Sequence, residues 1–284
     1  MSVDLGLTLL KAPALTNSYT AHLNRHFQLF VVIVAAGAIF PLLYLRQNFE
    51  ISILQSFDIT LSQLSNCYAL MGLIFAVTYL PSGWLADRFT PRLLILNSLV
   101  MTGSLGVWFA SIPSYQNLLF IFSGWGISTG LTFWAAHIKI VSILARGDYQ
   151  GRFFGLLDGG RGLVEAILAT TAIWIFASFL SHESHTSELA IKQVIYMYCI
   201  AIAVAAALAY SLLDDSKCES NPQQSEKFLV ELKLVISRQD VWIAAICILC
   251  GYQLFWATYS FSAHLQENYS LPAVTVGSIT VAKL

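Results

Sequence analysis

Long hydrophobic runs alternate with short polar segments along the chain. Seven runs are long enough to cross a bilayer: Phe27–Leu45, Leu61–Leu80, Leu93–Ile112, Leu118–Leu144, Phe153–Leu180, Ile191–Leu213 and Val241–Phe261. A bilayer core of about 30 Å takes roughly 20 residues at a helical rise of about 1.5 Å. An eighth run begins near Ala273, and its 12 residues would form about 18 Å of helix. Because lipid offers no partners for unpaired backbone groups, the pattern predicts an all-α polytopic membrane protein with seven spans and part of an eighth.

The composition agrees with a chain whose solvent is largely lipid. Hydrophobic residues make up 57% of it and charged residues 11%, with a mean hydropathy of +0.67. A soluble domain carries roughly 25% charged residues, so this chain has too few to cover a water-facing surface. Cys247 and Cys250 form a C-x-x-C pair inside an apolar run, and we expect two small helix residues there rather than metal or redox chemistry. Nothing in the pattern indicates an enzyme, a cofactor or a nucleic-acid partner.

Basic residues are distributed unequally between the two sides of the predicted spans. Ten lie in alternate connections on one side, and two, Arg46 and Lys192, lie on the other. Because Lys and Arg concentrate on the cytoplasmic side of membrane proteins, the bias predicts a cytoplasmic N-terminus. The ten are Lys11, Arg25, Arg88, Arg92, Arg146, Arg152, Lys217, Lys227, Lys233 and Arg238.

The polar stretch 214–240 divides the chain into two unequal parts. Before it lie a cytoplasmic N-terminus, residues 1–26, and the six spans of residues 27–213, whereas residues 241–284 begin a second bundle. Apolar residues at helical spacing within the stretch predict an amphipathic helix on the cytoplasmic face. These residues are Phe228, Leu229, Leu232, Val235 and Ile236. A linker helix that joins the two bundles is the simpler interpretation, and a regulatory or lipid-sensing element is the alternative.

The connection between the second and third spans carries a distinctive motif. From Gly83 to Arg92 it reads Gly-Trp-Leu-Ala-Asp-Arg-Phe-Thr-Pro-Arg. Gly83 would let two helices approach closely, and Asp87 could pair with Arg88, with Arg92 or with the N-terminus of a neighbouring helix. Such a contact can hold one arrangement of two bundles and break in another, so Gly83, Asp87, Arg88 and Arg92 are predicted to form a conformational switch.

This motif and its position resemble the cytoplasmic signature of the major facilitator superfamily, in which Gly and Leu precede Asp-Arg, a further Gly and basic residues. Thr90-Pro91 stands where Gly and a basic residue are common, although Pro91 suits the first turn of the third span. The resemblance implies a major-facilitator fold of two six-helix halves, with the substrate between them near the midplane. It also implies that Asp87 and Arg88 latch an outward-open state. The chain then corresponds to the N-terminal six-helix bundle, helix 7 and part of helix 8 of a longer protein.

The fifth span holds a cluster of charges. At 100° per residue, Asp158, Arg161 and Glu165 fall on one stripe of the helix, and Glu165 lies about 18 Å from Phe153, near the middle of the bilayer. A charge at that depth is costly, so the stripe should face the bundle interior. Two interpretations remain open: a structural three-member ion network, or a site in which Arg161 binds an anionic group and Glu165 carries a proton. The surrounding glycines, Gly155, Gly159, Gly160 and Gly162, are expected to allow close helix packing.

Aromatic and polar residues of the fourth and seventh spans are further candidates. In the fourth span, Gly126 and Gly130 have small-x-x-x-small spacing and precede Trp134, His137 and Lys139. His137 is interpreted as a packing histidine or as a pH-sensitive cavity residue, and Lys139 as a snorkelling cation. The resemblance implies that spans one, four and seven line the central cavity. The candidate substrate contacts are therefore Trp134 and His137 in the fourth span and Tyr252, Gln253 and Trp256 in the seventh. Helix packing is the alternative role for all of them.

These patterns together predict a secondary active transporter of a small polar or anionic solute, located in a bacterial inner membrane. Its expected partners are the lipid bilayer, a small-molecule substrate and, where Glu165 titrates, a coupling proton. Drug-efflux antiporters of the family carry a Gly-Pro motif in the fifth span, which has no proline here, so drug efflux is a weaker alternative. Many proton-coupled members place an Arg early in the fourth span, and Leu118–Trp125 contains none. A truncated fragment that does not transport is the remaining alternative.

Overall fold

The structure is entirely helical over the residues it describes. The computed structural model describes residues 15–145, 149–181, 186–214, 235–257 and 261–281. All regular secondary structure in these ranges is helical, which confirms the predicted all-α fold. The helices are α1 (Leu15–Leu43), α2 (Arg46–Phe57), α3 (Leu61–Arg88), α4 (Pro91–Phe109), α5 (Tyr115–Ile127), η1 (Ser128–Phe133), α6 (Trp134–Ala145), α7 (Gln150–Leu180), α8 (Ser187–Leu212), α10 (Gln239–Ala257), α11 (Phe261–Tyr269) and α12 (Ala273–Val281).

Six helical segments within the described ranges are long and apolar enough to cross a membrane. They are Arg25–Phe57, Leu61–Arg88, Pro91–Phe109, Tyr115–Ala145, Gln150–Leu180 and Ser187–Leu212. Each overlaps one of the first six predicted spans. The helix α10 overlaps the predicted seventh span, and α12 falls in the partial eighth.

The ends of two spans differ from the prediction because the helices continue through polar residues. The sequence predicts that the first span ends at Leu45, whereas the helical segment continues through α2 to Phe57. The residue that caps α2, Asp58, has a left-handed φ of 50°. The sequence also predicts a connection from Gly83 onward, whereas α3 continues to Arg88. Pro91 occupies the first turn of α4, as predicted.

The fourth span is one helical segment with a π-helical middle, η1. Two threonine hydroxyl groups of η1 donate hydrogen bonds to backbone carbonyls one turn earlier. Thr129 Oγ1 donates to the Trp125 carbonyl at 2.6 Å, and Thr132 Oγ1 donates to the Ser128 carbonyl at 2.5 Å. A π-helical turn inserts extra backbone and thereby changes the direction of the side chains that follow it. The side chain that follows η1 directly is Trp134.

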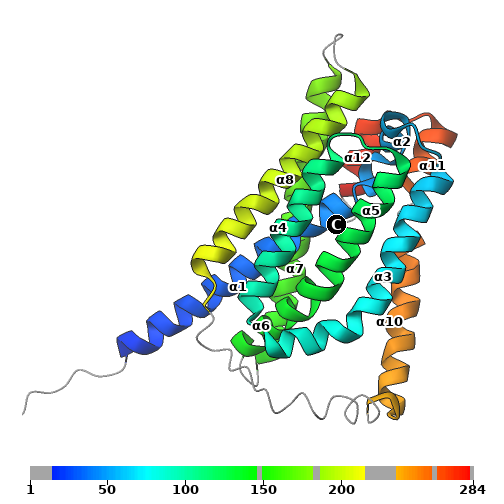
Figure 1. Ribbon diagram of the computed structural model, residues 1–284. Helices are drawn as coiled ribbons and strands as arrows, with labels where there is room; N and C mark the ends of the chain where they lie inside the picture. Colours follow the sequence, from blue (N-terminus) through cyan, green and yellow to red (C-terminus); the bar gives the residue numbers. More distant parts are fainter. Residues whose placement is uncertain (1–14, 146–148, 182–185, 215–234, 258–260, 282–284) are drawn as a thin grey trace, which may run out of the picture.

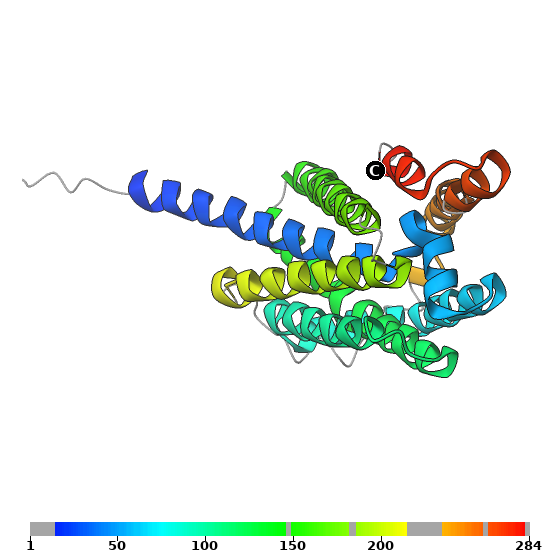
Figure 2. The same ribbon diagram turned by 90° about the horizontal axis from the view of Figure 1, so that it is seen from above.

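The core of the bundle lies where α1 packs between α7 and α8, α4 packs on α8, and α3 packs on α5 (Figure 1, Figure 2). Small residues permit these contacts. A Cβ added at Gly37 of α1 would lie 2.5 Å from Val164 Cβ of α7, and one at Gly160 of α7 would lie 2.8 Å from Ile33 of α1. The predicted packing role is therefore confirmed for Gly160.

The other glycines divide between close contacts and open space. A Cβ added at Gly126 would lie 2.9 Å from Ile74 of α3, and one added at Gly130 would overlap Thr78 of α3. The close contact expected from the small-x-x-x-small spacing is therefore confirmed. The packing prediction is wrong for Gly155 and Gly159, where an added Cβ would meet no described atom within 4 Å. These two glycines lie on the exposed part of the α7 surface, so no neighbouring helix requires them.

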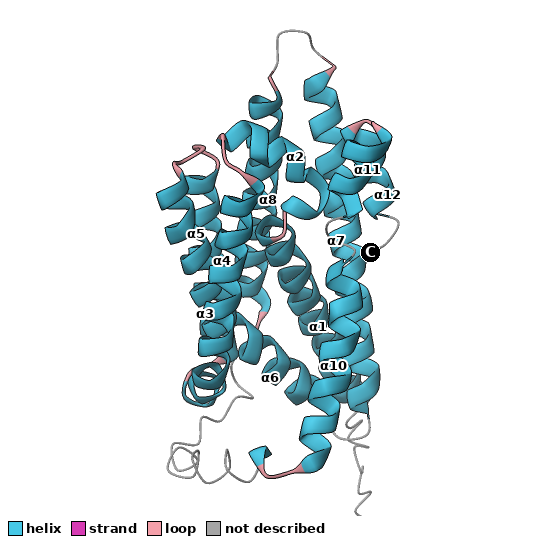
Figure 3. Ribbon diagram, turned by 90° about the vertical axis from the view of Figure 1, so that its right-hand side faces the viewer, coloured by secondary structure: helices cyan, strands magenta, loops and turns pink. Residues whose placement is uncertain are grey.

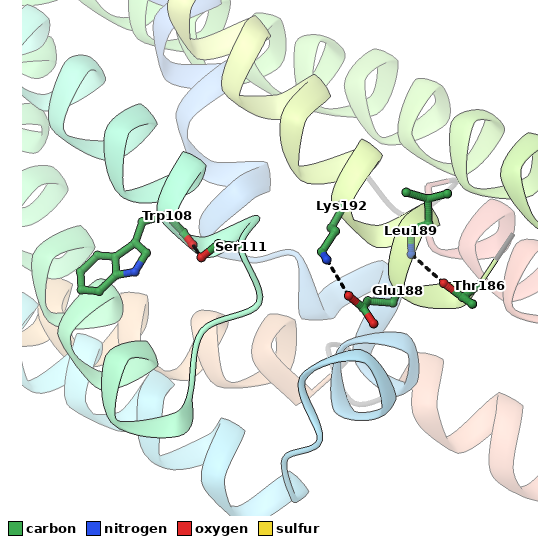
Figure 4. A network of polar contacts seen from close by, with 6 residues as sticks. All are labelled: Trp108, Ser111, Thr186, Glu188, Leu189 and Lys192. Atoms are coloured by element: carbon green, nitrogen blue, oxygen red, sulfur yellow. Dashed lines mark hydrogen bonds and ion pairs between the residues drawn. The ribbon is translucent and has the colours of Figure 1, made fainter.

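Side-chain contacts cap the helix α8 at its start. Thr186 Oγ1 accepts a hydrogen bond from the Leu189 N–H at 3.3 Å, and in the same first turn Glu188 pairs with Lys192 at 2.5 Å (Figure 4). A capping hydroxyl satisfies one of the free N–H groups at a helix N-terminus. Glu188 is also favourable there because an acid in the first turn interacts well with the helix dipole.

The helices that follow the six-span bundle lie along its edge (Figure 1, Figure 3). The side chains of residues 239–253 in α10 are exposed. The helix α12 packs on α7, where a Cβ added at Gly277 would lie 3.0 Å from Ile173. Most of the predicted amphipathic helix, including Phe228, Leu229 and Leu232, lies outside the described residues.

Candidate functional site

Three aromatic rings and two arginines form a continuous row inside the bundle, here called the aromatic row. The Arg161 guanidinium lies 5.8 Å from the centre of the Phe40 ring. Phe40 is stacked on Tyr44 at 6.4 Å, and Tyr44 is stacked on Tyr68 at 6.3 Å. At the other end, the Arg46 guanidinium lies 4.8 Å from the centre of the Tyr68 ring. The row therefore carries a cation at each end.

The end of α1 determines how this row is built. Phe40 and Tyr44 share a face because they are four residues apart on consecutive helical turns. The helix ends at Leu43, and its carbonyl accepts a hydrogen bond from the Tyr68 hydroxyl at 2.8 Å. Carbonyls at a helix C-terminus lack intrahelical partners, so this one is available to α3. Arg46, the first residue of α2, then lies over the same Tyr68 ring.

The fourth span adds a second group of rings beside Phe40. Trp134 lies edge-on to Phe40 at 6.0 Å and to Tyr79 of α3 at 6.1 Å. His137 is buried, stacked on Phe133 at 5.0 Å, with its Nδ1 3.2 Å from the Phe133 carbonyl. Trp134 is thus next to the aromatic row, and His137 lies one ring further from it, against Phe133 and Trp134.

The charges of the fifth span form a pair rather than a network of three. Arg161 Nε lies 3.5 Å from Glu165 Oε1, and the two side chains are 29% and 20% exposed. Asp158 is exposed and belongs to none of the ion pairs in the described part of the chain. The three-member ion network is therefore not formed, because the Asp158 side chain lies outside the pair although it shares the stripe.

The helix α2 holds a group of buried polar side chains that the sequence analysis missed. Arg46 Nε lies 3.4 Å from Glu50 Oε2, and Glu50 is only 3% exposed. Gln47 and Asn48 are also buried, and their Nε2 and Oδ1 atoms make no hydrogen bond within the described residues. Buried polar groups are nearly always hydrogen-bonded, so such a concentration requires an explanation. One signal was present, since Arg46 is one of only two basic residues on the side of the spans that is poor in Lys and Arg.

The candidates of the seventh span lie on α10. Tyr252 and Gln253 are exposed. The side chain of Trp256 lies outside the described residues.

The predicted switch has a different ion partner from those expected. Asp87 Oδ1 lies 3.3 Å from the Lys139 ammonium of α6, which also donates to the Ala86 carbonyl at 2.6 Å. The predicted pairing of Asp87 with Arg88 or Arg92 is therefore replaced by a contact between two helices, and Lys139 is more than a snorkelling cation. Arg88 lies over the Trp84 ring at 4.1 Å.

Two further arginines at the same end of the bundle also reach the last turn of another helix. Arg92 of α4 donates to the Tyr210 carbonyl of α8, and Arg25 of α1 donates to the Leu144 carbonyl of α6 at 2.6 Å. Cations stabilise the free carbonyls of a helix C-terminus.

The predicted packing role of Gly83 is wrong, because an added Cβ there would meet no described atom within 4 Å.

The long apolar helices, the internal ion pairs and the capped helix ends define an integral, multi-pass, all-α membrane protein. The chain belongs to the Major Facilitator Superfamily, whose family model matches residues 25–282. This confirms the family expected from the motif at Asp87.

Proteins of known sequence are similar to the chain over most of its length. The chain is 26% identical over 249 residues to the Inner membrane protein YihN of Escherichia coli, covering 86% of this chain and 58% of that protein. It is 27% identical over 274 residues to the Inner membrane protein YqcE of the same organism, covering 94% and 62%. It also resembles the Uncharacterized protein MG294 homolog of Mycoplasma pneumoniae, at 23% identity over 78% of this chain and 50% of that protein. The chain therefore spans about half to three-fifths of the length of these relatives.

Proposed function

We propose that the chain forms the solute-binding half of a secondary transporter for a small anionic solute. The observation that supports this most directly is the aromatic row, with Arg46 at one end and Arg161 at the other. An arginine inside a membrane protein is costly and usually marks a binding or ion pathway. The planar guanidinium suits carboxylate and phosphate oxygens, which it can bind through two parallel hydrogen bonds.

The rings between the arginines fit the rest of such a solute. Phe40, Tyr44 and Tyr68 are each partly buried, as expected for the wall of a binding cavity rather than for the centre of a core. Ligand pockets are generally lined by aromatic side chains with a few polar groups that fix orientation. Trp134 and His137 extend this wall from the fourth span. We propose Tyr252, Gln253 and Trp256 as contacts from the seventh.

Proton coupling and gating are proposed for the remaining charges. Glu165, beside Arg161, is the proposed proton carrier, and the contact between Asp87 and Lys139 is the proposed switch, with Arg88 and Arg92 beside it. We place the N-terminus in the cytoplasm and the protein in a bacterial inner membrane. In the sequence, ten basic residues fall in connections on one side of the predicted spans and two on the other, and the two E. coli relatives are called inner membrane proteins. Drug efflux fits less well, because apolar drugs do not require two arginines in the site.

The proposal is tested by solute counterflow in proteoliposomes. Liposomes containing the protein are loaded with organic acids, sugar phosphates, nucleosides or neutral amino acids, and exchange of the labelled solute is measured. We expect exchange of acids or sugar phosphates, and loss of that exchange in Arg46→Ala and Arg161→Ala at unchanged protein level. The matched control is Lys192→Ala, which removes the cation of a surface ion pair with Glu188, four residues away on the same helix. Normal exchange by Arg161→Ala, or exchange of nucleosides alone, would refute the proposal.

A further inference from the structure

We propose that Glu50 and Glu165 are internal counter-ions of the aromatic row, and that an anionic solute displaces them from Arg46 and Arg161 when it binds. The inference rests on the proposed function, since it assumes that the arginines receive an anion. It adds that the two carboxylates compete with the solute for the arginines, and that this competition determines how tightly an anion binds.

Both ends of the row have the same arrangement. Arg46 is followed by Glu50 and Arg161 by Glu165, in each case four residues later on the same helix. In each case the guanidinium also lies over a ring of the row, Tyr68 or Phe40. Each arginine is therefore held between its own carboxylate and the aromatic wall.

The ion pairs at the two ends of the row are loose. The Nε atoms lie 3.4 Å from Glu50 and 3.5 Å from Glu165, and neither Arg46 Nε nor Arg161 Nε makes a hydrogen bond in the described residues. Hydrogen-bonded arginine–carboxylate contacts are shorter, about 2.7–2.9 Å. The carboxylates neutralise the arginines electrostatically but do not saturate the five N–H donors of each guanidinium. Donors therefore remain for oxygen atoms of a solute.

The two members of each ion pair differ in exposure. Arg46 is 17% exposed and Glu50 3%, whereas Arg161 is 29% exposed and Glu165 20%. In both pairs the arginine is the more accessible member, so a solute anion meets the cation before the acid. A buried cation without a counter-charge is strongly unfavourable, and the empty site therefore needs the two carboxylates. The solute must separate each arginine from its own acid in order to bind.

This competition predicts two opposite effects of removing an acid. Glu50→Gln or Glu165→Gln should tighten anion binding, because the internal competitor is lost. The same substitution should lower the thermal stability of the empty protein, because a partly buried arginine is left without its counter-charge. A purely structural ion pair would give the loss of stability without the gain in affinity.

The test measures binding of inorganic phosphate to the purified protein in lipid nanodiscs, at constant pH and ionic strength, through tryptophan fluorescence. Trp134 lies against Phe40 and reports on the row. We expect each glutamine variant to bind phosphate about 5–150-fold more tightly than the wild type, the usual range of coupling between two groups. Glu188→Gln removes the acid of a surface pair with the same spacing and should bind like the wild type. Thermal unfolding with and without phosphate shows which variants are folded, and Glu165→Gln, whose acid is the less buried of the two, carries the test where Glu50→Gln does not fold.

The outcomes separate this inference from the proposed function. Saturable phosphate binding that Arg46→Ala and Arg161→Ala abolish, but that the folded glutamine variants leave unchanged or weaken, would overturn the counter-ion role and leave the anion site intact. Absence of saturable binding in the wild type and in the glutamine variants would overturn both. Binding that appears only in the glutamine variants would support the competition directly.

Discussion

The contact between Gly37 and α7 links the packing of the bundle to the geometry of its proposed site. In Gly37→Ala, the new Cβ would lie 2.5 Å from Val164 Cβ and 3.1 Å from the Arg161 carbonyl. Carbon atoms pack at about 3.5–4.0 Å, so α1 and α7 would have to separate by about 1 Å. Overpacking of this kind costs about 1–3 kcal/mol, which alanine offsets by roughly 0.5–1 kcal/mol through its better helix propensity. The net cost is about 0.5–2 kcal/mol, so for a chain of this size we expect a Tm lowered by about 1–8 °C.

The assay is thermal unfolding of the purified protein in a single detergent, followed by tryptophan fluorescence, together with phosphate binding in nanodiscs. Gly159→Ala is the matched control on α7, because its Cβ would meet no described atom within 4 Å. It should raise the Tm slightly or leave it unchanged. Since separation of α1 from α7 also draws Arg161 away from Phe40, Gly37→Ala should weaken anion binding as well. Equal Tm values for the two variants would refute the packing argument, and a lowered Tm with unchanged binding would refute its link to the site.

Three smaller perturbations test individual contacts. Asp87→Asn should change the Tm by less than about 4 °C, because the Asp87 side chain is 61% exposed and exposed ion pairs contribute about 0–1 kcal/mol. Lys139→Met should lower the Tm more, since it also removes a backbone hydrogen bond, and a smaller Tm loss for Lys139→Met than for Asp87→Asn would contradict this. Tyr68→Phe keeps the ring but loses the hydrogen bond to the Leu43 carbonyl, so denaturant unfolding should show a loss of about 0.5–1.5 kcal/mol, and an unchanged midpoint would count against it. Thr186→Ala removes the N-cap of α8 and should cost about 1 kcal/mol in the same measurement, whereas Thr186→Ser should cost little.

Much of the fold could be predicted from the sequence, because a membrane span is a local property of about 20 consecutive residues. The six spans of the bundle coincide with apolar runs, and their ends are where the prediction fails. The helix α2 contains Gln47, Asn48 and Glu50, which the pattern assigns to a polar connection, but neighbouring helices bury all three. Whether a polar segment faces water or other helices depends on tertiary packing, which a single chain pattern does not contain.

The candidate site divides in the same way. The pair of Arg161 and Glu165 could be predicted, because both residues lie on one helix and their spacing places them on one face. The contacts of Lys139 with Asp87 and of Arg46 with Tyr68 join different helices, and no spacing rule relates residues so far apart in the chain. The prediction that Arg161 belongs to a site therefore came from the sequence, whereas the second arginine required the structure.

The break at the end of α1 connects these observations. In an uninterrupted α-helix the Gln47 N–H would bond to the Leu43 carbonyl, four residues earlier. Here the Gln47 N–H bonds instead to the Tyr44 carbonyl at 2.9 Å, and the Leu43 carbonyl accepts the Tyr68 hydroxyl from α3. A continuous helix would satisfy that carbonyl within α1, so Tyr68 would lose the partner that holds it beside Tyr44. The change of backbone direction also sets where α2 begins, and thus where Arg46 meets the ring. The position of Arg46 over the Tyr68 ring therefore depends on one backbone irregularity. The hydrophobic pattern does not predict this irregularity, so Arg46 resembles an ordinary residue of a connection.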